Sequence, residues 1–204
     1  MNTDLEASLR ATAPAGAPDA TASVVRRAGD RAAAQRLVDL AYAVVPSPLG
    51  RLVLAASPRG LVTVAYEDGS LESILDKLAA RTSPRLLELP ARLDEPRREL
   101  DEYFEGRRRR FELRVDWALV RGFTRKVLQA TARIPYGSAS SYLEVAARAG
   151  SPRAVRAAGN ALGANPMPIV VPCHRVLRTG GGLGGYTGGL ERKRFLLDLE
   201  RHRL

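Results

Sequence analysis

Three short runs of apolar and β-branched residues follow one another between residues 41 and 66. They are AYAVV at 41–45, RLVLAAS at 51–57 and LVTVAY at 61–66, and the segments SPLG and SPRG separate them. Proline and glycine in such short connections favour tight turns. The pattern therefore predicts an antiparallel meander of three strands.

The apolar period then changes from that of a strand to that of a helix. Apolar residues recur at the spacing i, i+3, i+4 and i+7, namely Leu71, Ile74, Leu75 and Leu78. This spacing predicts a helix over 71–83 that buries one face on the sheet. A second helix is predicted over 93–106 with Gly106 at its end, and FELRV at 111–115 is predicted to return as one more strand.

Beyond Trp117 the pattern is helical. One face of the first segment is formed by Phe123, Val127, Leu128, Thr131 and Ile134, and the sequence PYG at 135–137 is predicted to end that helix. Ser141 and Glu144 have the spacing of a capping box, which predicts a helix start there and an end at Gly150.

A further helix is predicted from Ser151, as the N-cap, to Asn165, so the two short helices have the outline of a helix-turn-helix. Arg153 and Arg156 are predicted to lie one turn apart on the same helix face. Guanidinium groups there suit phosphate or base contacts in a nucleic acid, whereas the simpler alternative is a solvated helix face.

Composition and charge narrow the possible partners. The net charge is +10, and residues 142–204 hold ten Lys or Arg against four Asp or Glu, which favours polyanions as ligands. One cysteine excludes an internal disulfide, and one cysteine with two histidines is too few for a four-ligand structural zinc site. We expect no membrane span, no metal and no secretory signal, and thus a cytoplasmic protein.

The single cysteine, Cys173, follows an apolar run at 169–171 that is predicted to be a buried strand ended by Pro172. A lone cysteine is usually an inert, buried small residue. His174 beside it favours a nucleophile instead, since a nearby imidazole converts a thiol to the reactive thiolate. In the last helix, Glu200 is predicted to face inward and to orient His174.

A glycine-rich segment, TGGGLGGYTGGL at 179–190, lies between the cysteine and the last helix. It matches no phosphate-binding motif, so we expect its backbone to approach a flat ligand, with Tyr186 and Thr187 as its polar side chains. A helix-turn-helix beside a candidate nucleophile suits an enzyme that extracts and modifies a base.

The sequences IPYG, RAVRAAGNALGANP, IVVPCHRV, GGYTGGLERK and LLDLE resemble, in order and spacing, the 6-O-methylguanine-DNA methyltransferases. The resemblance implies an α+β fold, with a ribonuclease H-like domain at 37–115 and a mostly helical domain at 116–204 after a disordered tail at 1–36. It also implies an irreversible, single-turnover transfer of the alkyl group from 6-O-alkylguanine, and possibly 4-O-methylthymine, to Cys173.

The resemblance further implies the roles of individual residues. His174 would act as the base through a water, Asn165 would brace the turn beneath the cysteine, and Tyr142 would donate to the guanine ring. The DNA contacts would be Tyr142, Ser151, Arg153, Ala154 and Arg156, with Arg156 filling the gap left by the extracted base. The base pocket would comprise Val176, Tyr186, Thr187 and Gly188.

The implied partner is double-stranded DNA carrying alkylated guanine, bound through the minor groove by a monomer, with no cofactor. Two other interpretations stay open. An alkyltransferase-like protein would bind such lesions without repairing them, but proteins of that class replace the acceptor cysteine. A cysteine hydrolase would use a thiol and a base, but it has little use for the arginine-bearing helix pair.

Overall fold

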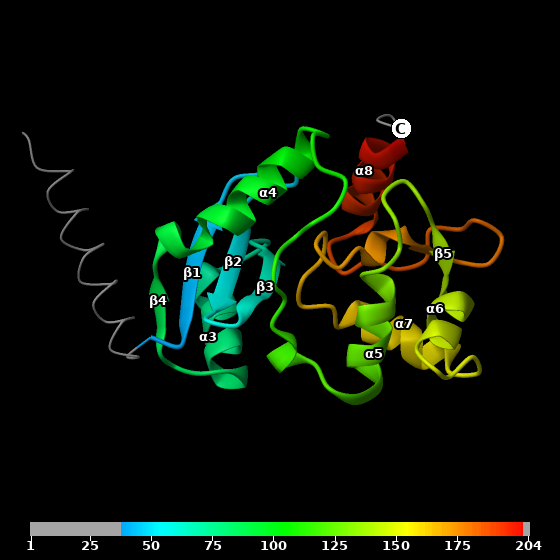
Figure 1. The fold of residues 1–204 in the computed structure, drawn as a ribbon, viewed down its shortest axis with the longest axis horizontal. Coiled ribbons are helices and arrows are strands. Elements are labelled where there is room, and N and C mark those ends of the chain that lie inside the picture. Colours follow the sequence, from blue (N-terminus) through cyan, green and yellow to red (C-terminus); the bar gives the residue numbers. More distant parts are fainter. Residues whose placement is uncertain (1–37, 202–204) are drawn as a thin grey trace, which may run out of the picture. The chain divides into compact units, whose positions relative to one another are not determined.

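The computed structural model describes residues 38–201, and those from Asp39 onward belong to one compact unit (Figure 1). The predicted tail at 1–36 lies outside the described residues. The division of the remainder near residue 116 stays a prediction.

The first half of this unit is built on a four-stranded sheet. Its strands are β1 (Leu40–Val45), β2 (Leu52–Ser57), β3 (Gly60–Tyr66) and β4 (Leu86–Glu88), in the order β3-β2-β1-β4. β1 to β3 pair antiparallel, which confirms the meander, and β4 is parallel to β1. The sequence analysis missed β4, because three residues are too few to show a period.

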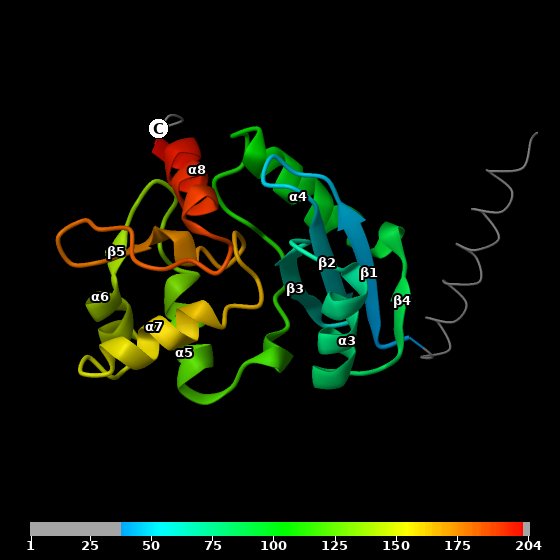
Figure 2. The ribbon, with the colours of Figure 1, turned by 180° about the vertical axis from the view of Figure 1, so that it is seen from behind.

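Helices cover both faces of this sheet. Four consecutive residues of β2, Leu52 to Ala55, are buried, which requires cover on both sides. The two views in Figures 1 and 2 place α3 (Leu71–Arg81) and α4 (Asp94–Phe104) on opposite faces. Leu78 of α3 packs against Leu40, Ala55 and Val62, so the predicted apolar face of this helix is confirmed.

The predicted strand at 111–115 is wrong. This segment forms a single isolated bridge to β3, in which the Leu61 amide donates to Arg114 O at 2.8 Å and the Asp116 amide donates to Leu61 O at 2.8 Å. The chain then turns away, because the Asp116 carboxylate accepts hydrogen bonds from Ser57 and Arg59 and caps the short 3-10 helix η2 (Trp117–Leu119). Residues 111–115 therefore touch the edge strand β3 at one point and do not add a strand to the sheet.

The second half is helical. It comprises α5 (Gly122–Thr131), α6 (Tyr142–Arg148), α7 (Val155–Gly163) and α8 (Leu190–Arg201), with a two-residue parallel pair of β5 (Ser140–Ser141) and β6 (Val176–Leu177). The capping box of Ser141 and Glu144 is confirmed at the start of α6. α5 ends at Thr131, before the predicted PYG signal, so Ile134 is buried in the loop after the helix.

The start of α7 differs from the prediction. Ser151 does not cap it: the Ala154 amide donates to Ser151 O at 2.9 Å in a turn, and the helix begins at Val155. Pro152 and Arg153 form a turn before the helix, so the first helical residue lies four positions after Ser151 rather than directly after it. Arg153 therefore precedes the helix, and its predicted place on one helix face with Arg156 is wrong.

Candidate functional site: a buried cysteine at the edge of a cavity

Cys173 follows an irregular turn, not the predicted strand. Ile169 to Val171 are buried as expected, but they form turns, and Ile169 has a φ of 74°. A β-branched residue rarely adopts this left-handed conformation, so the surrounding contacts must impose it. Cys173 then begins the short 3-10 helix η3 (Cys173–Arg175).

Asn165 holds this turn together. Its Nδ2 donates to Val171 O at 2.9 Å and to Cys173 Sγ at 3.1 Å, and its Oδ1 accepts from the Met167 amide at 3.0 Å. All of these groups are buried, so the hydrogen bonds are not exchanged with water. One amide side chain thereby fixes both the path of the turn and the position of the sulfur.

The sulfur lies at the edge of a cavity. Cys173 is 5% exposed and lines a space of about 400 Å³ together with Tyr142, Gly159, Tyr186 and Thr187. Burial raises the pKa of the Cys173 thiol, and the Asn165 hydrogen bond opposes this only in part. A raised pKa favours the protonated thiol, and ionisation of the sulfur by the imidazole stays a prediction.

His174 is fully buried and pairs with the last helix. Its Nε2 lies 2.9 Å from Glu200 Oε1, so the two side chains meet as predicted. Burial lowers the pKa of His174, which keeps the ring neutral, and an ionised carboxylate can only accept, so Nε2 carries the proton. Nδ1 is left as a bare acceptor and has no hydrogen-bond partner among the described residues.

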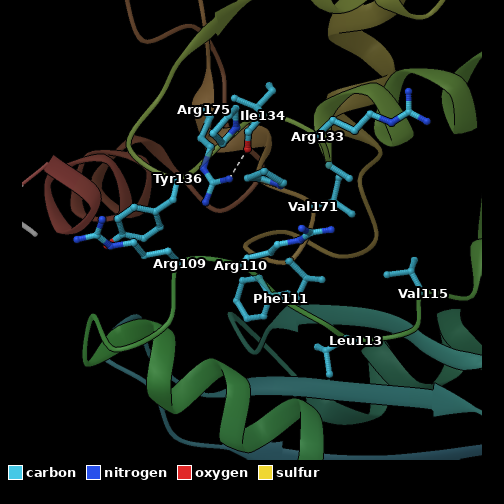
Figure 3. A pocket seen from close by; sticks show the side chains of 14 residues that line it. Arg109, Arg110, Phe111, Leu113, Val115, Arg133, Ile134, Tyr136, Val171 and Arg175 are labelled. Carbon is cyan, nitrogen blue, oxygen red and sulfur yellow. Dashed lines mark hydrogen bonds between the residues drawn. The ribbon is translucent and has the colours of Figure 1, made fainter. Parts of the chain in front are cut away.

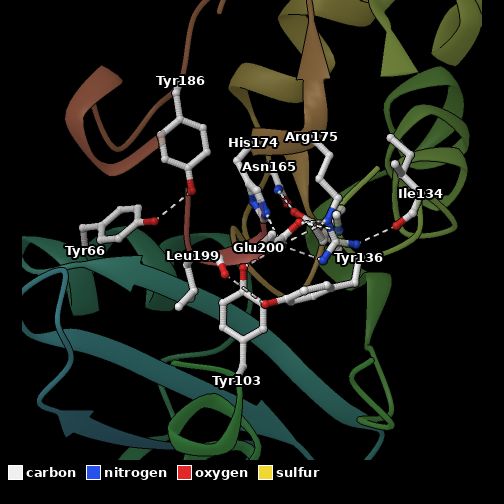
Figure 4. A network of polar contacts seen from close by, with 12 residues as sticks. Tyr66, Tyr103, Ile134, Tyr136, Asn165, His174, Arg175, Tyr186, Leu199 and Glu200 are labelled. Carbon is white, nitrogen blue, oxygen red and sulfur yellow. Dashed lines mark hydrogen bonds and ion pairs between the residues drawn. The ribbon is translucent and has the colours of Figure 1, made fainter. Parts of the chain in front are cut away.

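Glu200 is the centre of a buried polar network (Figure 4). Arg175 donates to both of its oxygens, with Nη2 at 2.8 Å from Oε1 and Nε at 3.0 Å from Oε2. The Tyr103 hydroxyl donates to Oε1 at 2.7 Å, and the Gly137 amide donates to Oε2 at 3.1 Å. His174 and Arg175 outweigh the burial cost and lower the pKa of Glu200 to about 2.

A buried lysine supports the glycine-rich segment. Lys193 Nζ donates to Val176 O at 2.7 Å and to Gly185 O at 3.3 Å, and also contacts Leu183 O. Burial lowers the pKa of Lys193 to about 8. The backbone oxygen of Val176, predicted to line the base pocket, is therefore one of the acceptors that hold this ammonium group.

Tyr186 is held from the sheet. Its hydroxyl lies 2.8 Å from that of Tyr66 at the end of β3 (Figure 4). The guanidinium of Arg192 lies over the Tyr66 ring, 4.2 Å from its centroid. A Cβ at Gly188 would overlap both tyrosine rings, so only glycine fits there. Thr187 Oγ1 donates to Gly163 O at 2.9 Å, which fastens the segment to the end of α7.

Tyr142 at the start of α6 closes another side of the cavity. A Cβ on Gly184 would come within 2.5 Å of the Tyr142 hydroxyl, and Gly184 has a φ of 66°. Glycine is the residue that permits this backbone conformation without strain. The close approach of Gly184 brings Tyr142 and the glycine-rich segment together around the cavity.

Apart from Tyr142, which lines the Cys173 cavity, the predicted DNA-contact residues lie at or near the start of α7. Arg153 and Arg156 are exposed, and Ser151 and Ala154 are half-buried. On the inner side of α7, Ala158, Ala161 and Leu162 are buried, so the helix leaves Arg156 directed to solvent. Whether these residues meet DNA stays a prediction.

The sequence analysis missed four residues of this site: Tyr66, Tyr103, Arg175 and Lys193. The tyrosines come from β3 and α4, and no local pattern links them to Glu200 or Tyr186. Lys193 had a usable signal, because it lies seven residues before Glu200 and therefore on the same face of α8. Arg175 is the residue after His174, but only its position in space shows that it pairs with Glu200.

No group of three His, Cys, Asp or Glu side chains among residues 38–201 is arranged to hold a metal ion. No helix in the same range has the length and apolar character needed to cross a bilayer.

Residues 122–202 match the family model described as the DNA binding domain of 6-O-methylguanine DNA methyltransferase, and residues 40–117 match its ribonuclease-like domain. These matches confirm the α+β class, with a sheet domain followed by a helical domain.

Curated relatives and solved structures cover most of the chain. The methylated-DNA–protein-cysteine methyltransferase of Mycolicibacterium paratuberculosis is 41% identical over 78% of this chain and 92% of its own length. The inducible enzyme of that name from Bacillus subtilis is 40% identical over 72% of this chain and 83% of its own.

The crystal structure of the Mycobacterium tuberculosis O6-methylguanine methyltransferase superposes with a TM-score of 0.69 at 36% identity, covering 81% of this chain and 94% of that one. Another structure of the same enzyme, in complex with DNA, has the same TM-score and identity. The chain belongs to the family of methylated-DNA–protein-cysteine methyltransferases.

Proposed function

We propose that this protein repairs alkylated DNA by moving the alkyl group from the 6-oxygen of an extracted guanine to Cys173. The observation that carries the assignment is the placement of the sulfur, which Asn165 holds at the edge of a cavity beside the His174–Glu200 pair. A volume of about 400 Å³ lies within the range of roughly 300–1,000 Å³ for small-ligand pockets.

The chemistry is a displacement at carbon. The sulfur attacks the alkyl carbon, a carbon–sulfur bond forms, and the bond between that carbon and the guanine oxygen breaks. The thiol proton passes through a water to Nδ1 of His174. Because Nε2 donates its proton to the Glu200 carboxylate, the lone pair of Nδ1 is free to accept. Tyr142 donates to the guanine ring as negative charge develops on the leaving base.

The raised pKa of the resting thiol has a functional consequence. A protonated thiol is a poor nucleophile, so Cys173 is protected from oxidants and other electrophiles until a base is bound. Since a thioether does not hydrolyse, each protein molecule reacts once. No cofactor takes part in this scheme.

The substrate is double-stranded DNA carrying alkylated guanine, bound in the minor groove by a monomer. α7 has small residues along it, which suits close approach to the groove, and Arg156 fills the place of the extracted base. A lesion-binding protein without repair activity is not favoured, because the acceptor cysteine is present. A cysteine hydrolase would leave the helix pair without a role.

One incubation tests this function. The full-length protein is mixed with an excess of duplex DNA carrying isotopically labelled methyl on the 6-oxygen of one guanine, and the intact protein is analysed by mass spectrometry. We expect one added methyl group per chain, located on Cys173 by peptide mapping, and no increase with longer times. Release of free methanol, or methyl addition at other residues, would contradict the proposal.

Arg156→Ala is expected to slow repair of duplex DNA by on the order of tenfold or more, because unstacking a base costs a few kcal/mol. The rate with free 6-O-benzylguanine should be unchanged, since that substrate has no stack to replace. Rates of loss of active protein measure both reactions. Arg97→Ala on α4 removes the same charge as a control, and equal losses on both substrates would show that Arg156 does not assist base extraction.

Tyr66→Phe is expected to slow the reaction with free 6-O-benzylguanine several-fold, because the half-buried Tyr186 hydroxyl loses its partner and no longer fixes the ring beside the cavity. Loss of a typical hydrogen bond costs roughly 0.5–1.5 kcal/mol. Tyr42→Phe, on β1 of the same sheet, is the control. If Tyr66→Phe raises the benzylguanine concentration that gives the half-maximal rate and leaves the maximal rate unchanged, Tyr66 positions the pocket. If the kinetics of Tyr66→Phe equal those of the wild type, Tyr66 has no such role.

A further inference from the structure

A second cavity lies apart from the one that contains the sulfur (Figure 3). Its volume is about 670 Å³, and it is lined by parts of the 109–115 segment, the loop after α5 and the turn at 170–172. It shares no lining residue with the Cys173 cavity, although Pro172 and Cys173 are adjacent in the chain. The proposed alkyl transfer gives this space no role.

The charge of this cavity is unbalanced. Four arginines line it, Arg109, Arg110, Arg133 and Arg175, and no Asp or Glu does. Another hollow of about 670 Å³ along α4 provides a comparison, since its four arginines are accompanied by five acidic residues. The two hollows thus have equal volumes and equal numbers of arginines but differ in their acidic residues.

The four arginines are not equivalent. Arg175 forms an ion pair with Glu200, and its Nη1 donates to Ile134 O at 2.6 Å. Arg109 lies over the Tyr136 ring, 5.9 Å from its centroid. Arg110 and Arg133 are exposed and have no ion-pair partner among residues 38–201. By contrast their neighbour Arg108 pairs with Glu99 and Glu102. Two guanidinium groups of this cavity thus lack an anion.

The remaining walls are apolar. Figure 3 shows Arg110 between Phe111 and Val171, and Leu113 and Val115 continue the wall along the same segment. An inorganic ion would leave these side chains without contact. A ligand that combines an anionic group with a flat organic body satisfies both parts, because arginine binds phosphate in a bidentate manner and apolar side chains contact a ring.

We propose that this cavity binds the phosphate of a nucleotide, with Arg110 and Arg133 on the phosphate and the half-buried Phe111 and Val115 against the nucleoside. The phosphate belongs either to a free nucleotide or to the 5′-phosphorylated end of a DNA strand. The site is distinct from the Cys173 cavity, because the two cavities share no lining residue and the phosphate contacts, Arg110 and Arg133, belong to neither the Asn165 turn nor the Glu200 network.

Calorimetric titration of the full-length, unalkylated protein tests the site with three probes: pyrophosphate, adenosine 5′-diphosphate, and a twelve-nucleotide single strand with or without a 5′-phosphate. We expect one diphosphate nucleotide per chain, bound more tightly than pyrophosphate. The double variant R110A/R133A should lose at least tenfold in affinity, and Arg97→Ala should lose none. Preference for the 5′-phosphorylated strand over both free probes would identify the strand end as the source.

Three outcomes would overturn the proposal: no saturable binding of any probe, unchanged affinity in the double variant, or equal weakening by Arg97→Ala, which would indicate only the general positive field. The Cys173→Ser variant should bind as the wild type does. Since no alkyl transfer is measured, failure here leaves the repair function untouched, and failure of repair leaves this site untouched. Circular dichroism of both arginine variants verifies that they are folded.

Discussion

Glu200→Gln is expected to lower the free energy of unfolding by about 3–5 kcal/mol and to abolish rapid alkyl transfer. The amide removes the negative charge that faces the buried guanidinium of Arg175, and an unpaired buried charge costs this much. It also presents an NH₂ group where His174 and Tyr103 both donate. Denaturant unfolding and the rate with free 6-O-benzylguanine measure the two effects.

Whether Glu200 stabilises or destabilises the folded state at a given pH follows from the direction of its pKa shift. The network holds the pKa of Glu200 at about 2, below its ordinary value of 4.5, so the folded state binds the proton less readily than the unfolded chain. The contribution, about 3 kcal/mol, is therefore complete above pH 4.5 and is lost as the pH falls towards 2. The difference in unfolding free energy between wild type and Glu200→Gln should shrink over the same interval.

Glu191→Gln provides the matched control, because it makes the same chemical change at an exposed position in the first turn of α8. Exposed changes of this kind shift stability by at most about 1 kcal/mol. If both variants lost the same stability, or if the wild-type advantage over Glu200→Gln persisted unchanged at pH 2, the buried network would not be the cause.

Cys173→Ser is expected to eliminate methyl acceptance entirely while leaving the fold intact. Serine is close in size to cysteine, and its hydroxyl can still accept the hydrogen bond from Asn165 Nδ2. An alcohol is ionised far less readily than a thiol, so the histidine cannot make it a competent nucleophile for the alkyl carbon. Intact mass after incubation with methylated duplex DNA should equal that of the unreacted protein.

The same variant separates binding from chemistry. Its affinity for duplex DNA should match that of the wild type within about twofold, because none of the predicted DNA contacts involves the sulfur. The melting temperature should change by only a few degrees. Residual methylation of Cys173→Ser would place the acceptor on another residue. Loss of DNA binding together with methylation would point to a disrupted turn instead.

Local patterns predicted much of the fold, and the failures have physical causes. The meander and the capping box of α6 depend on residues near one another in the chain, so their spacing predicted them. The expected strand at 111–115 failed because this segment forms only one isolated bridge to β3 before the chain turns at Asp116. The expected strand at 169–171 failed because a buried β-branched run is found equally well in a strand or in a turn that other residues hold. Asn165 decides the second case through its hydrogen bonds to Val171 and Cys173.

The sequence by itself determined the candidate pair of Cys173 and His174, the positive charge and the family resemblance, since these depend on residue identity and spacing alone. Only the tertiary structure decided that Tyr103 and Arg175 converge on Glu200, that Tyr66 contacts Tyr186, and that burial raises the pKa of the Cys173 thiol. Each of these depends on groups that are distant in the chain and share a low-dielectric interior. Solvation and pairing there follow from packing, which no local pattern encodes.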